Sequence, residues 1–483
     1  MAVPWTAPRP RPLGAPVPRP IPWELLPLVV TVLLLAVPLP VPAAGGGGLG
    51  PADYASGVLV LCCLARVLRT RSRPLSRTAA VVVGAPAVAI ALATVTAADP
   101  LAAVPGFVRY LQVFVLVPAA VVLLVRDARD FRAVTGALVV LALVQGAIGV
   151  HQYATGTGAS YMGEDIRAVG TFGPTDVMGM ATVVAYGLLA SAALALRTPK
   201  GAPVPLRPAA AGAAVLLVVP LGLSFSRGAW IATAVAALAM LTLAGVRRAL
   251  TVLAVAVAAT VVLVGGFGVG SAMIGARLSS ITQVTDAPDR SVTDRYTMWA
   301  AAESMWRGHP LTGVGLKGFP DHRDSHATIG LSSGSDTAGA GQEFLRQPLL
   351  SPHNMYLLIL SEQGLIGAVA FTGSWAALLV GGVRRLLVRR GALDCGLAAV
   401  ALTLWQTVDF LYADIGGPST VLTGVVFGLA ARWALAPLGE PVRAAGRVPG
   451  PATGTGVRAG ERARACTAPA PAPAPGPGSG TAG

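Results

Sequence analysis

The residue with the clearest chemical potential in this chain is His353, where polar sequence gives way to an apolar run. His353-Asn354 is followed by nine residues, then Gly364, two residues and Gly367. Pro352 suits the first or pre-helical position of a helix. We therefore expect the imidazole to lie near a membrane surface, within reach of a lipid headgroup and of an aqueous substrate. The alternative is an interfacial histidine whose ring only reaches for water.

A second candidate site is the segment Ser224-Phe-Ser226-Arg227-Gly228, a polar break between two apolar runs. A cation near a membrane boundary usually has a partner or a function. The guanidinium of Arg227 offers a planar fork of donors that suits bidentate binding of a phosphate group. The alternative is an arginine at a tight turn that extends its side chain to water.

A third polar segment runs from Arg167 through Gly170-Thr-Phe-Gly to Asp176. Here too an arginine precedes a turn and the start of an apolar run. Thr175 or Asp176 is suited to capping the helix that follows, so a purely structural role stays open beside substrate binding.

The composition places these candidates in a membrane protein. Of 483 residues, 54% are hydrophobic and 12% charged, and the mean hydropathy is +0.67. Apolar runs of about 20 residues can each cross a bilayer as a helix. We predict an all-α polytopic membrane protein with about 12 transmembrane helices. The predicted spans are 24–44, 52–69, 78–97, 107–125, 131–150, 175–196, 209–225, 228–245, 249–271, 354–381, 394–411 and 417–436. The pair 209–225 and 228–245 can also be read as one broken span.

Basic residues fix the predicted orientation, because they recur in alternate loops. By the positive-inside rule, both termini are cytoplasmic and one large loop, 272–352, is extracytoplasmic. The net charge of +14 then reflects topology and attraction to anionic lipids, so we expect membrane lipids and no nucleic acid as partners. Segments 1–22 and 437–483 are too poor in apolar side chains to fold and are predicted to be disordered.

The predicted domain organisation follows from these boundaries. Transmembrane helices 1–9 occupy 23–271, the extracytoplasmic loop 272–352 carries site residues, and helices 10–12 occupy 353–436. Within the loop, an amphipathic helix fits 293–307, with Tyr296, Trp299, Ala300 and Met305 on one side.

Metal and nucleotide motifs are weak or absent from the sequence. His322 and His326 have helical i,i+4 spacing, but no third ligand follows at motif spacing, so we interpret them as surface histidines and predict no metal site. The chain also has no Walker phosphate loop. The four cysteines fall in predicted helices or on the cytoplasmic side and imply no disulfide framework.

Taken together, these residues resemble the O-antigen ligase family, which includes O-antigen ligases, polysaccharide polymerases and protein O-oligosaccharyltransferases. The resemblance runs from about Arg167 to Gly367 and is strongest over His353-Asn354-x9-Gly364-x2-Gly367. The series Arg295-x3-Trp299-x2-Ala302 and Pro310-Leu-Thr-Gly-Val-Gly315 precedes it. Ser226-Arg227-Gly228 and Gly170-Thr-Phe-Gly also resemble family turns, whereas Asp176 stands where the family pattern has Asn.

The resemblance implies an inverting, metal-independent glycosyltransferase of the GT-C-like helical type that needs no cofactor. Its donor would be a polyprenyl-diphosphate-linked glycan, and its acceptor a hydroxyl of a glycan, lipid or protein. His353 suits the base that takes the hydroxyl proton. Arg227 and Arg295 suit stabilisation of the departing diphosphate. We assign Arg167, Asn354, Ser226 and Asp176 to substrate binding.

Two other classes of protein stay open. A transporter or flippase would carry ionisable groups in its helices and show related halves. Here the charges in spans, such as Asp53, Arg109 and Asp409, lie near span ends, and no repeat is visible. A binding or structural membrane protein is the third class. The concentration of polar residues in one outer loop favours an enzyme.

Overall fold

The computed structural model describes most of the chain between Pro22 and Ala436. The described residues are 22–38, 50–70, 75–161, 167–176, 178–247, 250–251, 290–328, 331, 335–339, 342–347, 349–388 and 391–436. Apart from Pro22, the predicted tails 1–22 and 437–483 lie outside them, as does the first part, 272–289, of the predicted outer loop.

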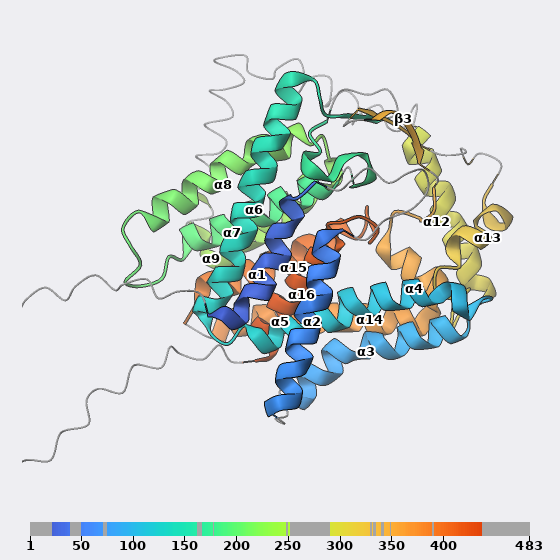
Figure 1. Cartoon of the computed structure of the whole chain (residues 1–483), viewed down its shortest axis with the longest axis horizontal. Coiled ribbons are helices and arrows are strands. Elements are labelled where there is room, and N and C mark those ends of the chain that lie inside the picture. The colour runs from blue at the N-terminus through green and yellow to red at the C-terminus, as the bar shows by residue number, and fades with distance from the viewer. Residues whose placement is uncertain are drawn as a thin grey trace, which may run out of the picture. The chain divides into compact units, whose positions relative to one another are not determined.

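The described part of the chain is mainly helical (Figure 1). The helices are α1 Leu26–Leu33, α2 Pro51–Thr70, α3 Arg77–Val95, α4 Pro100–Leu111, α5 Val117–Leu124, α6 Ala128–Thr155, α7 Gly179–Leu196, α8 Leu206–Leu223, α9 Arg227–Ala244, α12 Arg290–Gly308, α13 Phe319–His326, α14 Met355–Val388, α15 Leu393–Asp409 and α16 Thr420–Leu435. Short helical turns are η1 Trp23–Leu25, η2 Leu34–Ala36, η3 Gln112–Leu116 and η4 Gly170–Asp176. The strands are β1 Ala159–Tyr161, β2 Ser335–Gly339 and β3 Gln342–Gln347.

Eight helices among the described residues are long and apolar enough to cross a membrane. Eight predicted spans coincide with them: 52–69, 78–97, 107–125, 131–150, 175–196, 209–225, 228–245 and 354–381. Three more, 24–44, 394–411 and 417–436, coincide with shorter helices: Trp23–Ala36, α15 and α16. Span 249–271 lies almost wholly outside the described residues. The polytopic helical class is confirmed, and the total of twelve stays a prediction.

The break at Ser224–Ser226 separates two complete helices. Helix α8 ends at Leu223 and α9 begins at Arg227. Between them Phe225 has a φ of 50°, in the left-handed region that turns the chain sharply. The interpretation of 209–225 and 228–245 as one broken span is therefore wrong.

A small antiparallel sheet is the main departure from an all-α fold. Its order is β1-β2-β3, so β1, which comes before Arg167, pairs with β2 of the predicted outer loop.

Helix α12 departs from its predicted face as well. Met298, Ala302 and Met305 are buried on it, whereas Tyr296 is 61% exposed and Ala300 is also exposed. Small and flexible residues, rather than the aromatic ring, therefore fill the interface.

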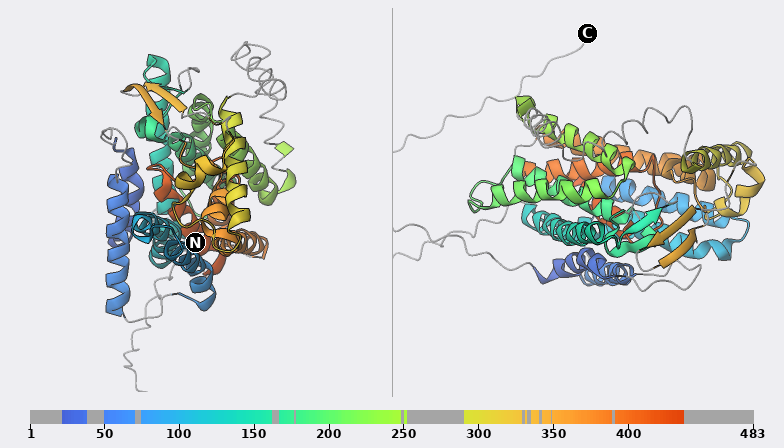
Figure 2. Two further views of the ribbon diagram at one scale, coloured as in Figure 1. Left: turned by 90° about the vertical axis from the view of Figure 1, so that its right-hand side faces the viewer. Right: turned by 90° about the horizontal axis from the view of Figure 1, so that it is seen from above.

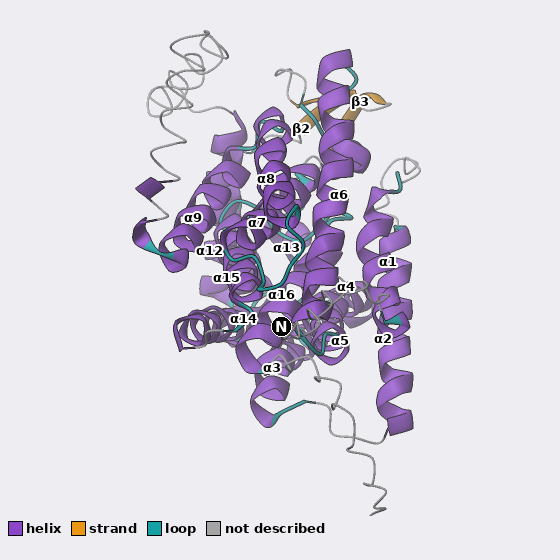
Figure 3. Cartoon of the chain, turned by 90° about the vertical axis from the view of Figure 1, so that its left-hand side faces the viewer, coloured by secondary structure: helices purple, strands orange, loops and turns teal. Residues whose placement is uncertain are grey.

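Helices α15 and α16 form the centre of the bundle. Nearly every residue of both is buried, and α15 packs on α7, α9, α14 and α16. Figures 2 and 3 show the same enclosure from other sides. The turn that joins these two helices is consequently held in a fixed position by all the elements around it.

Helix α14 is broken at Gly364, and a glycine-rich turn fills the break. Gly364 has a φ of 62°, which interrupts the helical hydrogen bonds. The Val314 N–H donates to the Ser361 carbonyl (2.8 Å), and the Leu365 N–H donates to the Pro310 carbonyl (2.9 Å). A methyl group on Gly364 would lie 2.3 Å from the Leu311 backbone. The glycines of α14 and of the turn 310–315 thus allow the backbones of these two segments to come into contact.

Replacing Gly364 by alanine is expected to destabilise the protein. The left-handed backbone alone costs about 1–3 kcal/mol for a residue with a Cβ, and the contact with Leu311 adds to this. Gly373→Ala is the matched control, because Gly373 lies in the same helix with open space around it. Melting temperatures of the purified variants in detergent check this. Equal melting temperatures for the two variants would contradict the account of the break.

Candidate functional site

His353 lies two residues before the first residue of α14, and its neighbours in the chain are held from two sides. The Trp299 indole N–H of α12 donates to the Pro352 carbonyl (2.9 Å). The Met355 N–H donates to the Phe410 carbonyl (2.9 Å) and to the Ala413 carbonyl (3.1 Å). His353 itself has a φ of 48°. The backbone around the imidazole is thus tied to α12 and to the connection between α15 and α16.

Asn354 caps α14. Its Oδ1 accepts a hydrogen bond from the Leu357 N–H (3.1 Å), the arrangement expected of a helix N-cap. The predicted helix start is confirmed to within a residue or two. The cap explains Asn354 without a substrate, so its binding role stays a prediction.

The connection between α15 and α16, here called the 410–419 turn, contacts three of the segments that the sequence analysis singled out. It accepts both hydrogen bonds of Met355. A methyl group on Gly228 would lie 3.3 Å from the Cβ of Tyr412, so the start of α9 packs on the turn. The Oδ2 of Asp176 accepts from the Ser419 N–H (3.0 Å). Three segments far apart in the sequence therefore meet on one turn.

Arg227 is the first residue of α9, and Ser226 is its N-cap. The Ser226 Oγ accepts from the Ala229 N–H (3.2 Å), and the hydroxyl is buried. This bond accounts for Ser226 structurally. Arg227 thus stands at the N-terminus of a helix, where the helix dipole also favours an anion.

Charges of both signs act on His353. Burial lowers the pKa of His353 below its ordinary value of 6.5, the nearby Asp414 carboxylate opposes that shift, and Arg295 adds to it. The ring is therefore neutral at pH 7 and able to accept a proton. Arg295, one helical turn before Trp299 on α12, lies close enough to interact with His353.

Asp414 is a candidate site residue that the sequence analysis did not identify. It lies in the 410–419 turn, and its Oδ2 is buried without a hydrogen-bond partner among the described residues. Its charge acts on His353 and on Glu362, which is buried in α14 just before the break. The feature of the sequence that could have identified Asp414 is an acidic residue in a short loop without lysine or arginine. The predicted topology places this loop on the outer side of the membrane.

Arg167 and Asp176 lie at the two ends of a segment that is held from both sides. The Arg167 backbone pairs with Ala159, and the Ala168 N–H donates to the Leu223 carbonyl (3.1 Å) beside the turn before Arg227. Asp176 accepts from the Gly179 N–H as well as from Ser419, and burial raises the pKa of its carboxyl group. Asp176 therefore accepts from the first residue of α7, whereas the N-cap position expected for Thr175 or Asp176 is occupied by Met178, which makes no side-chain cap.

Two glutamines of α6 hold the segment between Arg167 and Asp176 in place. The Gln145 Oε1 accepts from the Thr171 N–H (2.9 Å), and its Nε2 donates to the Thr171 hydroxyl. The Gln152 Oε1 accepts from the Gly170 N–H (2.8 Å), and its Nε2 donates to the Gly170 carbonyl (2.8 Å). These glutamines lie inside a long apolar helix, and the sequence analysis did not identify them.

A model described as O-antigen ligase matches residues 212–372. Over this segment, about a third of its length, the chain is similar to the O-antigen ligase family. The match contains Ser226, Arg227, Arg295, His353 and Asn354. Arg167, Asp176 and the 410–419 turn lie outside it, although the turn contacts the matched O-antigen ligase segment at Gly228 and Met355. No curated protein matches the chain.

No set of three His, Cys, Asp or Glu side chains is arranged to bind a metal ion within the part of the chain that the structure describes. His322 Nδ1 lies 2.9 Å from the Gly318 carbonyl, and His326 Nδ1 lies 2.8 Å from the Ser304 hydroxyl. Each of these histidines therefore has its own local partner.

Proposed function

We propose that this chain is a membrane glycosyltransferase of the O-antigen ligase family. It moves a glycan from a polyprenyl-diphosphate donor to an acceptor hydroxyl on the outer face of the membrane, and both termini are cytoplasmic. The observation that carries the proposal is the convergence of the segments bearing His353, Arg227 and Asp176 on the 410–419 turn, with Arg295 beside His353.

The chemistry is a single displacement. The neutral imidazole of His353 takes the proton of the acceptor hydroxyl while the hydroxyl oxygen attacks the anomeric carbon. The bond between that carbon and the diphosphate oxygen breaks, and polyprenyl diphosphate leaves with the bonding electron pair. One displacement inverts the anomeric configuration. The negative charge of Asp414 favours the imidazolium that forms.

Arg227 and Arg295 stabilise the leaving group. Negative charge develops on a phosphate oxygen during the displacement, and fixed cations in a partly dehydrated site act most strongly there. This arrangement needs no divalent ion, so we expect activity to be insensitive to chelators. Arg167, Ser226, Asn354 and Asp176 belong to the substrate-binding surface in this proposal.

Reconstitution tests the proposal directly. Purified protein in liposomes with lipid-linked glycan and an acceptor glycan should release free polyprenyl diphosphate and yield an elongated or glycosylated acceptor. Movement of intact donor across the bilayer without diphosphate release would support a transporter or flippase instead. The broken α14 is the feature that a transporter would share, but the backbone of the glycine-rich turn fills this break.

The acid limb of the pH profile should move in opposite directions in two variants. Asp414→Asn removes the charge that raises the pKa of His353, so the loss of kcat/KM on acidification should occur at lower pH than in the wild type. Arg295→Gln removes a charge that lowers this pKa, so the loss should occur at higher pH. Asp321→Asn, on the exposed surface of α13, is the control. An unchanged limb in both variants would exclude His353 as the titrating base.

A further inference from the structure

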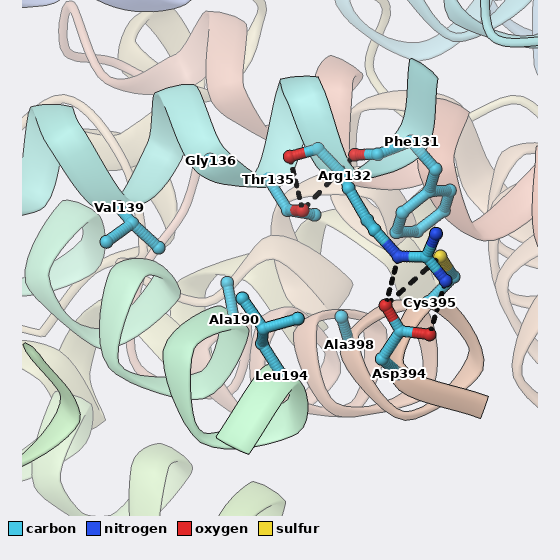
Figure 4. Close-up of a pocket in the computed structure, with 10 residues that line it drawn as sticks. All are labelled: Phe131, Arg132, Thr135, Gly136, Val139, Ala190, Leu194, Asp394, Cys395 and Ala398. Carbon is cyan, nitrogen blue, oxygen red and sulfur yellow. Dashed lines mark hydrogen bonds and ion pairs between the residues drawn. The ribbon is translucent and has the colours of Figure 1, made fainter. Parts of the chain in front are cut away.

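A recess between α6, α7 and α15 has no role in the proposed reaction (Figure 4). It lies at the first turn of α15, with Asp394 and Ala398, whereas the 410–419 turn follows the other end of this helix. The 17 residues of α15 place about 25 Å between the two ends. The enclosed part of the recess has a volume of about 50 Å³, and the recess is partly open to its surroundings. On the predicted topology, this end faces the basic cytoplasmic loops.

The recess is polar at one end. Arg132 Nε donates to Asp394 Oδ2 (2.5 Å), and Arg132 Nη2 donates to Asp394 Oδ1 (2.9 Å). Asp394 is buried, whereas the Arg132 side chain is 32% exposed. The third nitrogen, Nη1, makes no hydrogen bond to the described residues. Arg132 thus neutralises Asp394 and keeps donors directed outward.

The rest of the recess is apolar. Figure 4 shows Val139, Leu194 and Ala398 along it, and Gly136 opposite the α7 side chains. A methyl group on Gly136 would meet no atom within 4 Å. Because Gly136 lacks a side chain, the surface of α6 between Arg132 and Val139 stays open, and a hydrocarbon chain can lie against this groove.

The charge around the polar end is positive in excess. Arg129 is exposed one turn before Arg132, and Arg197 follows Leu194 at the end of α7. Among the described residues, Asp130 and Asp127 beside this end already have partners. Asp130 pairs with Arg126, with Arg126 Nε lying 3.2 Å from Asp130 Oδ2, and Asp127 caps α6 through its bond to the Arg129 N–H. An anion is therefore favoured over a cation at this end.

We propose that this recess binds one anionic glycerophospholipid. Its phosphodiester accepts from Nη1 of Arg132, its headgroup charge faces Arg129 and Arg197, and one acyl chain lies against Gly136 and Val139. This inference does not depend on the proposed glycosyl transfer, because the recess is remote from the 410–419 turn. The recess has a polar end followed by an apolar groove. A phospholipid is an abundant ligand with the same arrangement, because its phosphate is followed by a hydrocarbon chain.

Lipid retention by the full-length protein tests the inference. Delipidated protein in detergent is titrated with phosphatidylglycerol, and bound lipid is counted by native mass spectrometry alongside the melting temperature. We expect one retained lipid and a higher melting temperature. Inorganic phosphate at the same concentration should produce neither effect, because it lacks the acyl chain.

Filling the groove should weaken this binding. Gly136→Leu displaces at least two methylene groups of the acyl chain, which at about 0.8 kcal/mol each weakens binding by roughly tenfold or more. Gly84→Leu is the matched control, since Gly84 also lies in a membrane helix with open space around it. Val139→Phe fills the same groove about one helical turn further along α6. It is the second test variant if Gly136→Leu fails to fold.

Three results would overturn the inference. They are unchanged phosphatidylglycerol binding by both groove-filling variants, equally tight binding of zwitterionic phosphatidylethanolamine, and the absence of any tightly retained lipid in the wild type. Unchanged binding by the variants would exclude the groove as the site of the acyl chain. Equally tight binding of phosphatidylethanolamine would contradict the charge argument, and the absence of a retained lipid would exclude the site itself. None of these measurements uses glycosyl transfer, so they fail or succeed independently of the proposed function.

Discussion

The His353→Ala variant is expected to lose most of its glycosyl transfer while it still inserts into the membrane and still binds lipid-linked donor. Removing a general base typically costs roughly 10²–10⁴-fold in rate. The donor is bound mainly by the arginines in this proposal, so the Kd for lipid-linked glycan should change little. The measurements are release of polyprenyl diphosphate in liposomes and donor binding to the purified protein.

The matched control is His151→Ala. His151 lies near the end of α6 with an exposed side chain, so its loss removes an imidazole without touching the site. The control should retain wild-type turnover. Near-normal turnover of His353→Ala would remove the proposed base, and the transfer would then need another group, for which Asp414, whose charge acts on His353, is a candidate.

The membrane helices could be predicted because a bilayer imposes a length on each apolar run. Helices α6 and α9 coincide with their predicted spans to within a few residues of the apolar core. The small sheet could not be predicted in the same way. Strand β1 pairs with a strand about 175 residues later through backbone groups, and neither segment has a run of β-branched residues.

The site was predictable only where polar residues interrupt apolar sequence. His353 and Arg227 stand out for that reason, and the structure places both beside the 410–419 turn. Asp414 and the glutamines Gln145 and Gln152 did not stand out, because their importance comes from contacts with residues distant in the sequence. Such long-range contacts leave no periodic signal. The face of α12 was assigned wrongly because Tyr296, an interfacial aromatic side chain, lies outside the core.

The arginine variants should show a different pattern from His353→Ala. Arg227→Ala is expected to weaken donor binding as well as rate, because in the proposed reaction the guanidinium contacts the diphosphate before and during its departure. Loss of one fixed donor to developing charge costs roughly 10²–10³-fold in turnover. Arg295→Ala should behave similarly. Arg227→Lys should rescue poorly, since an ammonium group cannot reproduce the bidentate fork.

Arg247→Ala provides the control for Arg227, because it removes an exposed arginine just beyond the other end of α9. The 18 residues of this helix separate the two ends by about 27 Å, so any general effect of charge on membrane insertion should appear in both variants. Only Arg227→Ala should raise the Kd for lipid-linked donor. If Arg227→Lys restored full binding and rate, a point charge would suffice and the bidentate account of diphosphate binding would be wrong. If Arg247→Ala lost activity to the same extent, the effect would reflect insertion and not contact with the leaving group.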